Sequence, residues 1–455
     1  MVQFGFWSLI PALSVIALAL LTRRTLEALI AGALIGFVIL KGTDFFSGFV
    51  NAALKVMRDP SIGWIILVCG LFGSLIALLV RGGGAMAFGN WLSRYVKGKR
   101  SALIATWLLG LMIAIDDYLI ALTVSTSMKK VTDRFKVPRE MLGYTVASTA
   151  APVCVLTPIS TWAVYVAGLL EANKIAAAGH GTSKYIASIP FMFYDWCVVT
   201  LVPLAAIGVI PTLGRLMRKA QKRAESGTTI PPGGVPKEAA GDEIAANAKE
   251  NPRLINFILP IGALVGATWY CGINALKGVF VALAITIVML AIQKIMTLPQ
   301  IFDTAMDGFK TMILPLGIVA ASFVLKEAND GLGLTNFVID IVKPLMNSKL
   351  LPVISFLSLS LVTFTTGSFW GVYAIAIPIV IPLAQAMHAN QSLTIAAVVS
   401  SGAFGSHACF FGDAMVLTAT GSGCSPLELA LAQLPYALLA ATMAAMLFLT
   451  AGFIF

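Results

Sequence analysis

The chain has 455 residues, of which 58% are hydrophobic and 11% are charged, and it carries a formal net charge of +10. Soluble domains have roughly 25% charged residues, so this composition excludes an ordinary water-soluble protein. Because each helical crossing of a membrane takes roughly 20 residues, the length allows on the order of ten to twelve crossings, and we expect an all-α polytopic membrane protein.

The longest hydrophilic stretch, residues 216–252, is too short to fold as a nucleotide-hydrolysing domain. No GxxxxGKS or GxxxxGKT motif occurs, and no Ser/His/Asp or HExxH arrangement stands out. We therefore expect a protein that is not an enzyme. Any transport must use an ion or solute gradient, unless a separate subunit supplies the energy.

Twelve apolar segments follow one another along the chain, six on each side of the hydrophilic stretch. They cover residues 4–22, 25–41, 61–80, 101–128, 140–171, 188–214, 253–273, 275–295, 311–325, 350–386, 391–420 and 427–454. The halves are weakly similar, since residues 90–91 correspond to 336–337 and residues 147–152 to 400–405. Internal repeats of this size are typical of secondary transporters. We expect a first membrane repeat at 1–215, a cytoplasmic linker at 216–252 and a second, inverted membrane repeat at 253–455.

Basic residues flank the fourth segment, 101–128, on both sides. Arg94, Lys97, Lys99 and Arg100 precede it, and Lys129, Lys130, Arg134, Lys136 and Arg139 follow it. Since basic residues favour the cytoplasmic side, both ends of the segment are expected there. The sequence therefore predicts a re-entrant hairpin whose tip, residues 114–118, lies near the middle of the membrane. If residues 350–386 form the matching hairpin, each half has five crossings, and the odd number inverts the second half.

Asp116 and Asp117 are neighbours at this tip. An aspartate at the centre of a bilayer costs about 2.5 to 3.5 kcal/mol, and intramembrane acids usually mark ion or proton paths. If both carboxyl groups face a partly dry cavity, protons and a cation compete for the same oxygens, which is the physical basis of cation/proton exchange. We expect both residues to bind ions and protons and to be sodium ligands. In the alternative, one of them caps a half-helix or pairs with a buried basic residue.

Residues 147–162 combine several hydroxyl side chains with Pro152 and Pro158. Each proline removes a helical hydrogen bond and frees carbonyls of the preceding turn. Freed carbonyls and hydroxyls suit sodium, so Ser148, Thr149 and Thr157 are expected to bind the ion. The alternative is a proline-kinked helix whose hydroxyls bond to their own backbone.

In the second half, residues 363–371 occupy the position of the aspartate tip and are polar without being charged. Hydroxyls and glycine amides at the start of a half-helix can bind an anion, and its carbonyls can bind a cation. We expect Thr365, Thr366, Gly367 and Ser368 to bind substrate. The alternative is a tight packing turn that the glycines permit.

The eleventh segment holds His407 and Asp413 at membrane depth. They are not neighbours on a regular helix, but a break at Gly405 or Gly412 can bring them together. We expect Asp413 to bind ions or protons. His407 is expected to line the substrate site as a proton relay or pH sensor, or to be a hydrogen-bonded buried histidine. Earlier in the chain, Asp195 is interpreted as a site residue, a helix cap or an interfacial acid.

Several of these stretches resemble the NhaC-type sodium/proton antiporter family of the ion transporter superfamily. The matching pieces are 115–118 (Ile-Asp-Asp-Tyr), 122–124 (Leu-Thr-Val), 133–134, 148–162, 366–371, 377–379, 421–424 and 433–436. The resemblance implies an inner-membrane carrier that works by alternating access, with the aspartate tip, residues 148–161 and 366–371, and Asp413 near the transport site. Thr123, inside a matching piece, is then a further expected ion-binding residue. Sodium and protons are the implied coupling ions, with no other cofactor.

One departure from the family pattern concerns residues 406–410. Family members commonly have an acid followed by His-Cys-Ser-Pro, where this chain has Ser-His-Ala-Cys-Phe. The lining around Cys409 is thus more apolar, which suits an organic solute better than a bare ion, and we expect Cys409 to be a substrate-binding residue. We expect sodium/proton antiport; the alternative is sodium- or proton-coupled transport of an amino acid or small carboxylate. Membrane lipids are expected partners, nucleic acid is not, and a homodimer is left open.

Overall fold

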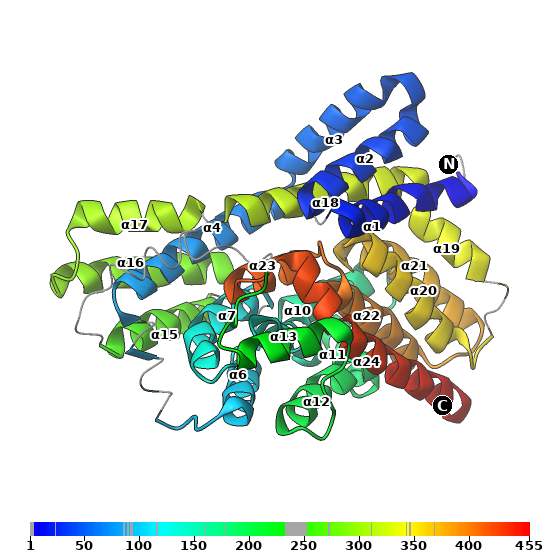
Figure 1. Ribbon diagram of the computed structural model, residues 1–455. Coiled ribbons are helices and arrows are strands. Elements are labelled where there is room, and N and C mark those ends of the chain that lie inside the picture. The colour runs from blue at the N-terminus through cyan, green and yellow to red at the C-terminus, as the bar shows by residue number, and fades with distance from the viewer. Residues whose placement is uncertain are drawn as a thin grey trace.

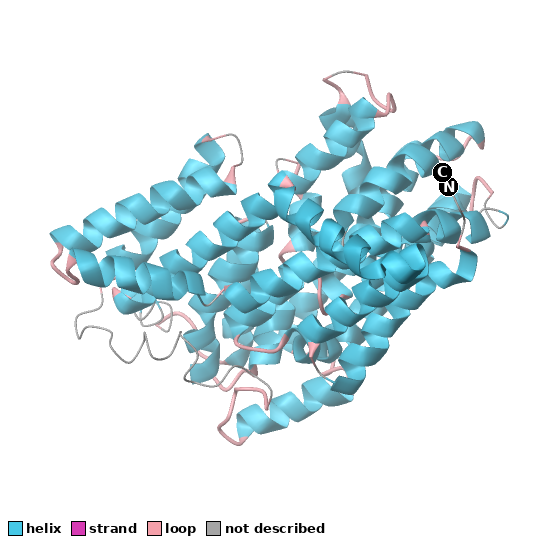
Figure 2. Ribbon diagram, turned by 90° about the horizontal axis from the view of Figure 1, so that it is seen from above, coloured by secondary structure: helices cyan, strands magenta, loops and turns pink. Residues whose placement is uncertain are grey.

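The computed structural model describes residues 4–455 except 23, 85–86, 89–90, 92–93, 115–116, 159, 178, 233–252, 272–273, 311, 343, 345–346 and 368. Among the described residues every regular element is a helix and none is a strand (Figures 1 and 2). This confirms the all-α prediction.

The helices of the first half follow most of the predicted segments, but they divide the longer ones. Their bounds are η1 (Gly5–Leu9), α1 (Ile10–Thr22), α2 (Thr25–Lys41), η2 (Gly42–Asp44), α3 (Phe45–Arg58), α4 (Pro60–Arg81), α6 (Lys99–Met112), α7 (Asp117–Arg134), α8 (Arg139–Ala147), α9 (Ala151–Leu156), α10 (Thr161–Ala172), α11 (Gly181–Ser188), η3 (Ile189–Phe191) and α12 (Phe193–Ile207). Helix α13 (Arg215–Glu225) occupies the start of the predicted linker.

The second half has a similar order of elements. Its bounds are α15 (Ile255–Tyr270), α16 (Ala275–Ile292), α17 (Leu298–Lys310), α18 (Ile313–Leu332), α19 (Leu334–Val342), α20 (Leu351–Thr366), α21 (Phe369–Ala386), α22 (Gln391–Ala408), α23 (Asp413–Ser422) and α24 (Pro426–Ile454). Corresponding helices begin at nearly constant spacing: α6 and α20 are 252 residues apart (351 − 99), and so are α7 and α21 (369 − 117).

Local chemistry explains why the long predicted segments are interrupted. The predicted segment 140–171 becomes three helices, since Pro152 lies in the first turn of α9 and Ser160 caps α10 by accepting the backbone N–H of Ala163 at 3.1 Å. Proline cannot donate the helical hydrogen bond, and a serine cap replaces one that the first turn lacks.

Helices α3 and α17 lie outside the predicted segments. Both mix apolar and charged residues: α3 ends with Lys55 and Arg58 in its last turn, and α17 ends with Lys310. An amphipathic helix has its apolar residues on one face and not in a continuous run, so a search for apolar runs does not detect it.

By length and composition alone, four helical stretches in the described part of the chain can cross a membrane: Leu26–Arg58, Ile62–Arg81, Gln391–Ser422 and Pro426–Ile454. The bent pair Gly181–Phe191 and Phe193–Ile207 can form a fifth crossing. Several shorter apolar helices accompany them. These lengths establish a multi-pass membrane protein, while the number of crossings stays a prediction.

The helices form two groups (Figure 1). In the outer group, α4 packs against α16 and α17, and α2 packs against α1 and α18. In the central group, α7 packs against α23, α20 against α22, and α12 against α24. The core lies in the central group, where α22 is buried from Leu393 to Ala408.

Both ends of the α6–α7 pair lie beside the same segment. At the start of α6, the ammonium of Lys99 pairs with Glu225, the last residue of α13, at 3.2 Å. At the end of α7, Asp133 accepts a hydrogen bond from the hydroxyl of Thr229, four residues beyond α13, at 2.6 Å. The last residue of α13 and the segment after it therefore connect the start of α6 to the end of α7.

The ends of the α20–α21 pair lie near the opposite end of α24. The ammonium of Lys349, just before α20, lies 5.2 Å from the ring centroid of Phe453 near the end of α24. After α21, Gln391 accepts a hydrogen bond from Lys184 of α11 at 2.6 Å. The η3 turn that follows α11 also lies at this end of α24, since the ring of its Phe191 contacts the ring of Phe455. By contrast, the start of α24 follows a turn that contacts Arg139, beside the end of α7.

Candidate functional site

Four helix breaks of the central group are close together in its interior. They lie between α6 and α7, α8 and α9, α20 and α21, and α22 and α23. Gly367 in the third break has a φ of +67°, and a Cβ on it would lie 2.6 Å from the ring of Phe411 in the fourth break. Only glycine tolerates both this backbone angle and this approach. A helix break within a membrane leaves backbone groups that protein or a cavity must surround, and the interior of the central group provides such surroundings.

Tyr118, which follows Asp117 in the first half of the chain, binds Asp413 in the second half. Asp413 is the first residue of α23 and is 4% exposed; its Oδ1 accepts the N–H of Ala414 at 2.8 Å, and its Oδ2 accepts the phenol O–H of Tyr118. Tyr118 directly follows Asp117, the first residue of α7, which is 1% exposed. The ring of Tyr118 packs on Trp64 of α4, with the centroids 5.9 Å apart. Both acids thus lie at the starts of helices, where the helix dipole favours negative charge.

A small residue permits this meeting of α7 and α23. Gly421 of α23 faces Ser125 of α7 so closely that a Cβ on Gly421 would lie 1.8 Å from the Ser125 Oγ. The hydroxyl of Ser125 donates to the carbonyl of Ala121 in its own helix. Any larger side chain at 421 must therefore separate the helices that carry Asp117 and Asp413.

His407 joins four helices of the central group. Its Nδ1 lies 2.7 Å from the phenol oxygen of Tyr194 on α12, and its Nε2 lies 3.1 Å from the hydroxyl of Ser148 after α8. Its carbonyl accepts a hydrogen bond from Gln433 of α24. The residue is 1% exposed. Hydroxyls on both ring nitrogens satisfy a neutral imidazole in either tautomer.

Most of the other predicted hydroxyls bond to their own helices. The donors and their carbonyl acceptors are Thr149 to Val146 at 3.0 Å, Thr157 to Val153 at 2.8 Å, Thr365 to Leu361 at 3.0 Å and Thr366 to Val362 at 2.9 Å. This is the geometry of the kinked-helix alternative. Their oxygens keep acceptor capacity, so their part in ion or substrate binding stays a prediction.

Two predicted site residues, Asp116 and Ser368, lie outside the described residues. Cys409 is fully buried at the end of α22, beside the glycine of the α20–α21 break. No group of three His, Cys, Asp or Glu side chains of the kind that holds a metal ion occurs in the ranges that the structure describes. Sodium needs only oxygen ligands, so carboxylates, hydroxyls and freed carbonyls at the breaks are the candidate donors.

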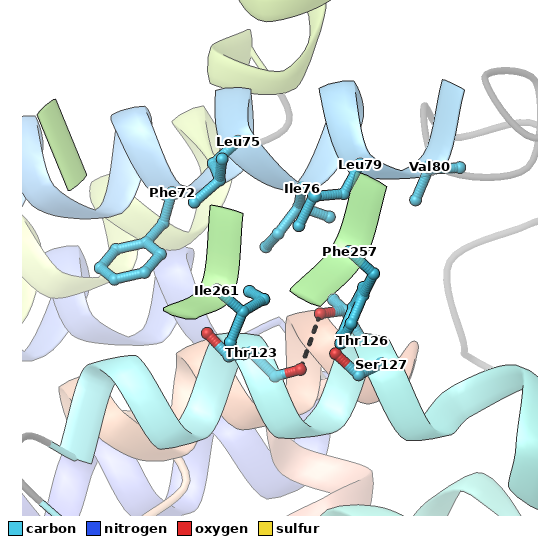
Figure 3. A pocket seen from close by; sticks show the side chains of 10 residues that line it. All are labelled: Phe72, Leu75, Ile76, Leu79, Val80, Thr123, Thr126, Ser127, Phe257 and Ile261. Carbon is cyan, nitrogen blue, oxygen red and sulfur yellow. Dashed lines mark hydrogen bonds between the residues drawn. The ribbon is translucent and has the colours of Figure 1, made fainter. Parts of the chain in front are cut away.

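Thr123 lies at a different place, on the wall of a small pocket between α4, α7 and α15 (Figure 3). Apolar side chains of α4 and α15 form most of the wall: Phe72, Leu75, Ile76, Leu79, Val80, Phe257 and Ile261. Thr123, Thr126 and Ser127 of α7 face them. The pocket lies beside the contact between α4 of the outer group and α7, the helix that carries Asp117.

Sequence reasoning did not select three residues that hold this site together: Tyr118, Tyr194 and Gln433. Tyr118 had a signal, because a phenol directly after two intramembrane acids is a natural hydrogen-bond donor to another buried acid. Tyr194 and Gln433 had none, since their contacts with His407 depend on how α12 and α24 pack.

Interrupted apolar helices with buried acids at the interruptions define a multi-pass membrane protein of the ion-transporter class. A model of the Na+/H+ antiporter family matches residues 153–453, and the chain belongs to this family. The match confirms the family resemblance drawn from the sequence. An uncharacterized protein of Haemophilus influenzae (strain ATCC 51907 / DSM 11121 / KW20 / Rd) is 28% identical, over 98% of this chain and 91% of that protein.

Proposed function

We propose that the chain is a sodium/proton antiporter of the inner membrane that works by alternating access. The observation that carries this proposal is the hydrogen bond between Tyr118 and Asp413, because it joins the first turn of α7, where Asp117 lies, to the start of α23. The proposed site thus takes an acid from each half of the chain. Membership of the Na+/H+ antiporter family adds the identity of the two ions.

The exchange chemistry follows from burial. Asp117 and Asp413 are 1% and 4% exposed, and burying a carboxylate costs free energy that a bound cation or a proton offsets. Hard cations prefer carboxylate oxygens as ligands. Sodium and the proton therefore exclude one another at the same oxygens, and each gradient can drive the other ion.

The positions of the two hairpins support alternating access. The ends of α6–α7 lie near the start of α24, and the ends of α20–α21 lie near its end. Helix α24 has 29 residues, a length of about 43 Å at 1.5 Å per residue, which exceeds a hydrocarbon core of about 30 Å. Two hairpins that open on opposite sides are what inverted repeats require, and each offers a route to the site from one side.

Proteoliposomes with an internal pH dye and an imposed pH gradient test this function. We expect added sodium to collapse the gradient for the wild type and to have no effect for Asp117→Asn, which removes the charge without changing the size of the side chain. The matched control is Asp307→Asn, because Asp307 is a half-exposed acid on α17 that pairs with Lys310. Wild-type exchange by Asp117→Asn contradicts the proposal.

A sodium- or proton-coupled transporter of an amino acid or small carboxylate is the second candidate. The lining of the α22–α23 break favours it, because Ala408, Phe410 and Phe411 are 1%, 3% and 0% exposed and Phe411 lies against Gly367. An apolar wall beside polar turns can hold an organic solute. If sodium alone leaves the pH gradient intact, this candidate predicts sodium- or proton-driven uptake of such solutes.

A further inference from the structure

A third buried acid, Asp195, directly follows Tyr194, the residue that contacts His407. It is the third residue of α12 and is fully buried. Its Oδ2 accepts a hydrogen bond from the hydroxyl of Ser400 on α22 at 2.7 Å. In the part of the chain that the structure describes, its Oδ1 is enclosed and has no hydrogen-bond partner.

The titratable groups nearest Asp195 are phenols and a thiol. The titratable side chains near it are Tyr185 of α11, Tyr194 and Cys197 of α12, and Tyr373 of α21. Beyond these, α9 brings Cys154 to Tyr185, and α22 brings His407 to Tyr194. No charged side chain of α6 or α24, which also pack on α12, interacts with Asp195, and none of the ion pairs between described residues includes it.

The neighbouring hydroxyls have other acceptors. The phenol of Tyr185 donates to the carbonyl of Val155 at 2.6 Å, and that of Tyr373 donates to the carbonyl of Val399 at 2.6 Å. Sodium in this place would need several oxygen ligands, whereas a proton needs only the carboxyl itself. The Ser400 hydroxyl and the start of α12 favour the charged form, but a fully buried carboxylate with no cation is still less stable than the protonated acid.

We propose that Asp195 is a second proton-binding site of the carrier, loaded in the conformation described and emptied during each transport cycle. This inference rests on the proposed exchange function. Ser400 and His407 lie seven residues apart on α22, about 10 Å along a helix, and Asp413 lies beyond the following break. Ser400, the partner of Asp195, thus lies two helical turns before the break that precedes Asp413, and the Asp195 carboxyl adds one proton to each exchange. Asp117 interacts electrostatically with Tyr373, a neighbour of Asp195.

The binding of the proton is tested directly by infrared difference spectroscopy of the purified protein during a pH titration. Asp195→Asn is expected to remove one C=O stretching band of a protonated carboxyl. Ser400→Ala keeps the acid but removes its hydrogen bond, so it is expected to shift the same band. The matched control is Ser401→Ala, since the hydroxyl of Ser401 donates to Val398 in its own helix at 2.6 Å; this variant should leave the band in place.

The role in transport is tested by measuring, in proteoliposomes, which pH gradient just balances a given sodium gradient so that net flux stops. The ratio of protons to sodium ions from this balance is expected to fall by one in Asp195→Asn. An unchanged ratio overturns the proposal, because a merely structural hydrogen bond between α12 and α22 does not set stoichiometry. An unchanged carboxyl band in Asp195→Asn also overturns it. If Asp195→Asn does not fold, a carboxyl band that stays unshifted in Ser400→Ala overturns the proposal instead.

The two proposals can fail separately. Absence of sodium-driven proton movement in the wild type contradicts the antiport function, whereas the infrared titration still decides whether Asp195 binds a proton.

Discussion

At the scale of single residues, Tyr118 connects the two halves of the chain. Its ring packs on Trp64 of the outer group, and its phenol bonds to Asp413 of the central group. A hydrogen bond to a charged acceptor contributes on the order of 1.5 to 3 kcal/mol. Tyr118 therefore both orients the Asp413 carboxylate and stabilises its charged form.

Replacing Tyr118 tests this role. Tyr118→Phe keeps the ring but removes the donor, so the charged form of Asp413 loses its stabilisation and protons compete more strongly with sodium. We expect sodium/proton exchange to persist with its activity shifted to higher pH. The measurement is the pH profile of exchange in proteoliposomes, with Tyr270→Phe as the control, since Tyr270 is 90% exposed. An unchanged profile contradicts the role assigned to Tyr118.

At the scale of helices, breaks and close packing create the site. The sequence predicted the breaks around residues 114–118, 147–162 and 363–371, because prolines, glycines and polar residues interrupt apolar runs there. It did not predict which breaks meet, since that depends on crossings such as the one between α7 and α23. Gly421 lies in a piece that matches the family, but nothing in the sequence showed that its lack of a side chain permits this crossing.

Gly421→Ala tests the crossing. The new methyl group would lie 1.8 Å from the hydroxyl of Ser125, so α7 and α23 must separate and Asp413 must move away from Tyr118. We expect exchange to fall at least about tenfold, since overpacking of this kind costs on the order of 1 to 3 kcal/mol. The double variant with Ser125→Ala should recover part of the activity.

A helical glycine with open space is the control for this experiment. Nothing lies within 4 Å of a Cβ added to Gly266 of α15, so Gly266→Ala should keep full exchange. Full activity of Gly421→Ala would show that the close approach of α7 and α23 is not needed.

At the scale of the whole molecule, α13 and the residues after it hold the α6–α7 pair in place. Arg223 of α13 binds both carboxylate oxygens of Glu140 at the start of α8, at 2.6 and 2.8 Å. Asp133 at the end of α7 pairs with Arg139 at 3.1 Å and accepts from Thr229 at 2.6 Å. The start of the predicted linker is thus a packed element that holds the end of α7 against the start of α8.

Arg223→Ala tests this role. Glu140 has only 6% of its side chain exposed, so removing its partner leaves a buried charge without compensation, while the 22% exposure of Arg223 reduces the effect. We expect a loss of about 2 kcal/mol in stability. The measurement is the melting temperature in detergent. The control is Arg218→Ala, because Arg218 is exposed and donates to the backbone of Gly214; it should change stability by less than about 0.5 kcal/mol. Equal melting temperatures for the two variants would contradict the claim that the Arg223–Glu140 pair stabilises the protein.

Composition and apolar patterning were sufficient to predict an all-helical membrane protein, and the charge of Asp117 and Asp413 marked two residues of the proposed site. Amphipathic α3 and α17 were missed because their apolar residues are not continuous. The Tyr194 contact with His407 was missed because it joins residues 213 positions apart. Patterns along a chain describe local environment, whereas a site built at the meeting of several breaks depends on tertiary packing.

The most direct test of the central claim is the affinity of the purified protein for sodium, measured by calorimetry over a range of pH. If sodium and a proton compete at the acids beside Tyr118, the Kd for sodium should rise as the pH falls, by up to about tenfold per pH unit where one proton is displaced per ion. In Asp413→Asn this dependence should be weakened or lost. A sodium affinity in the wild type that does not change with pH would contradict the account.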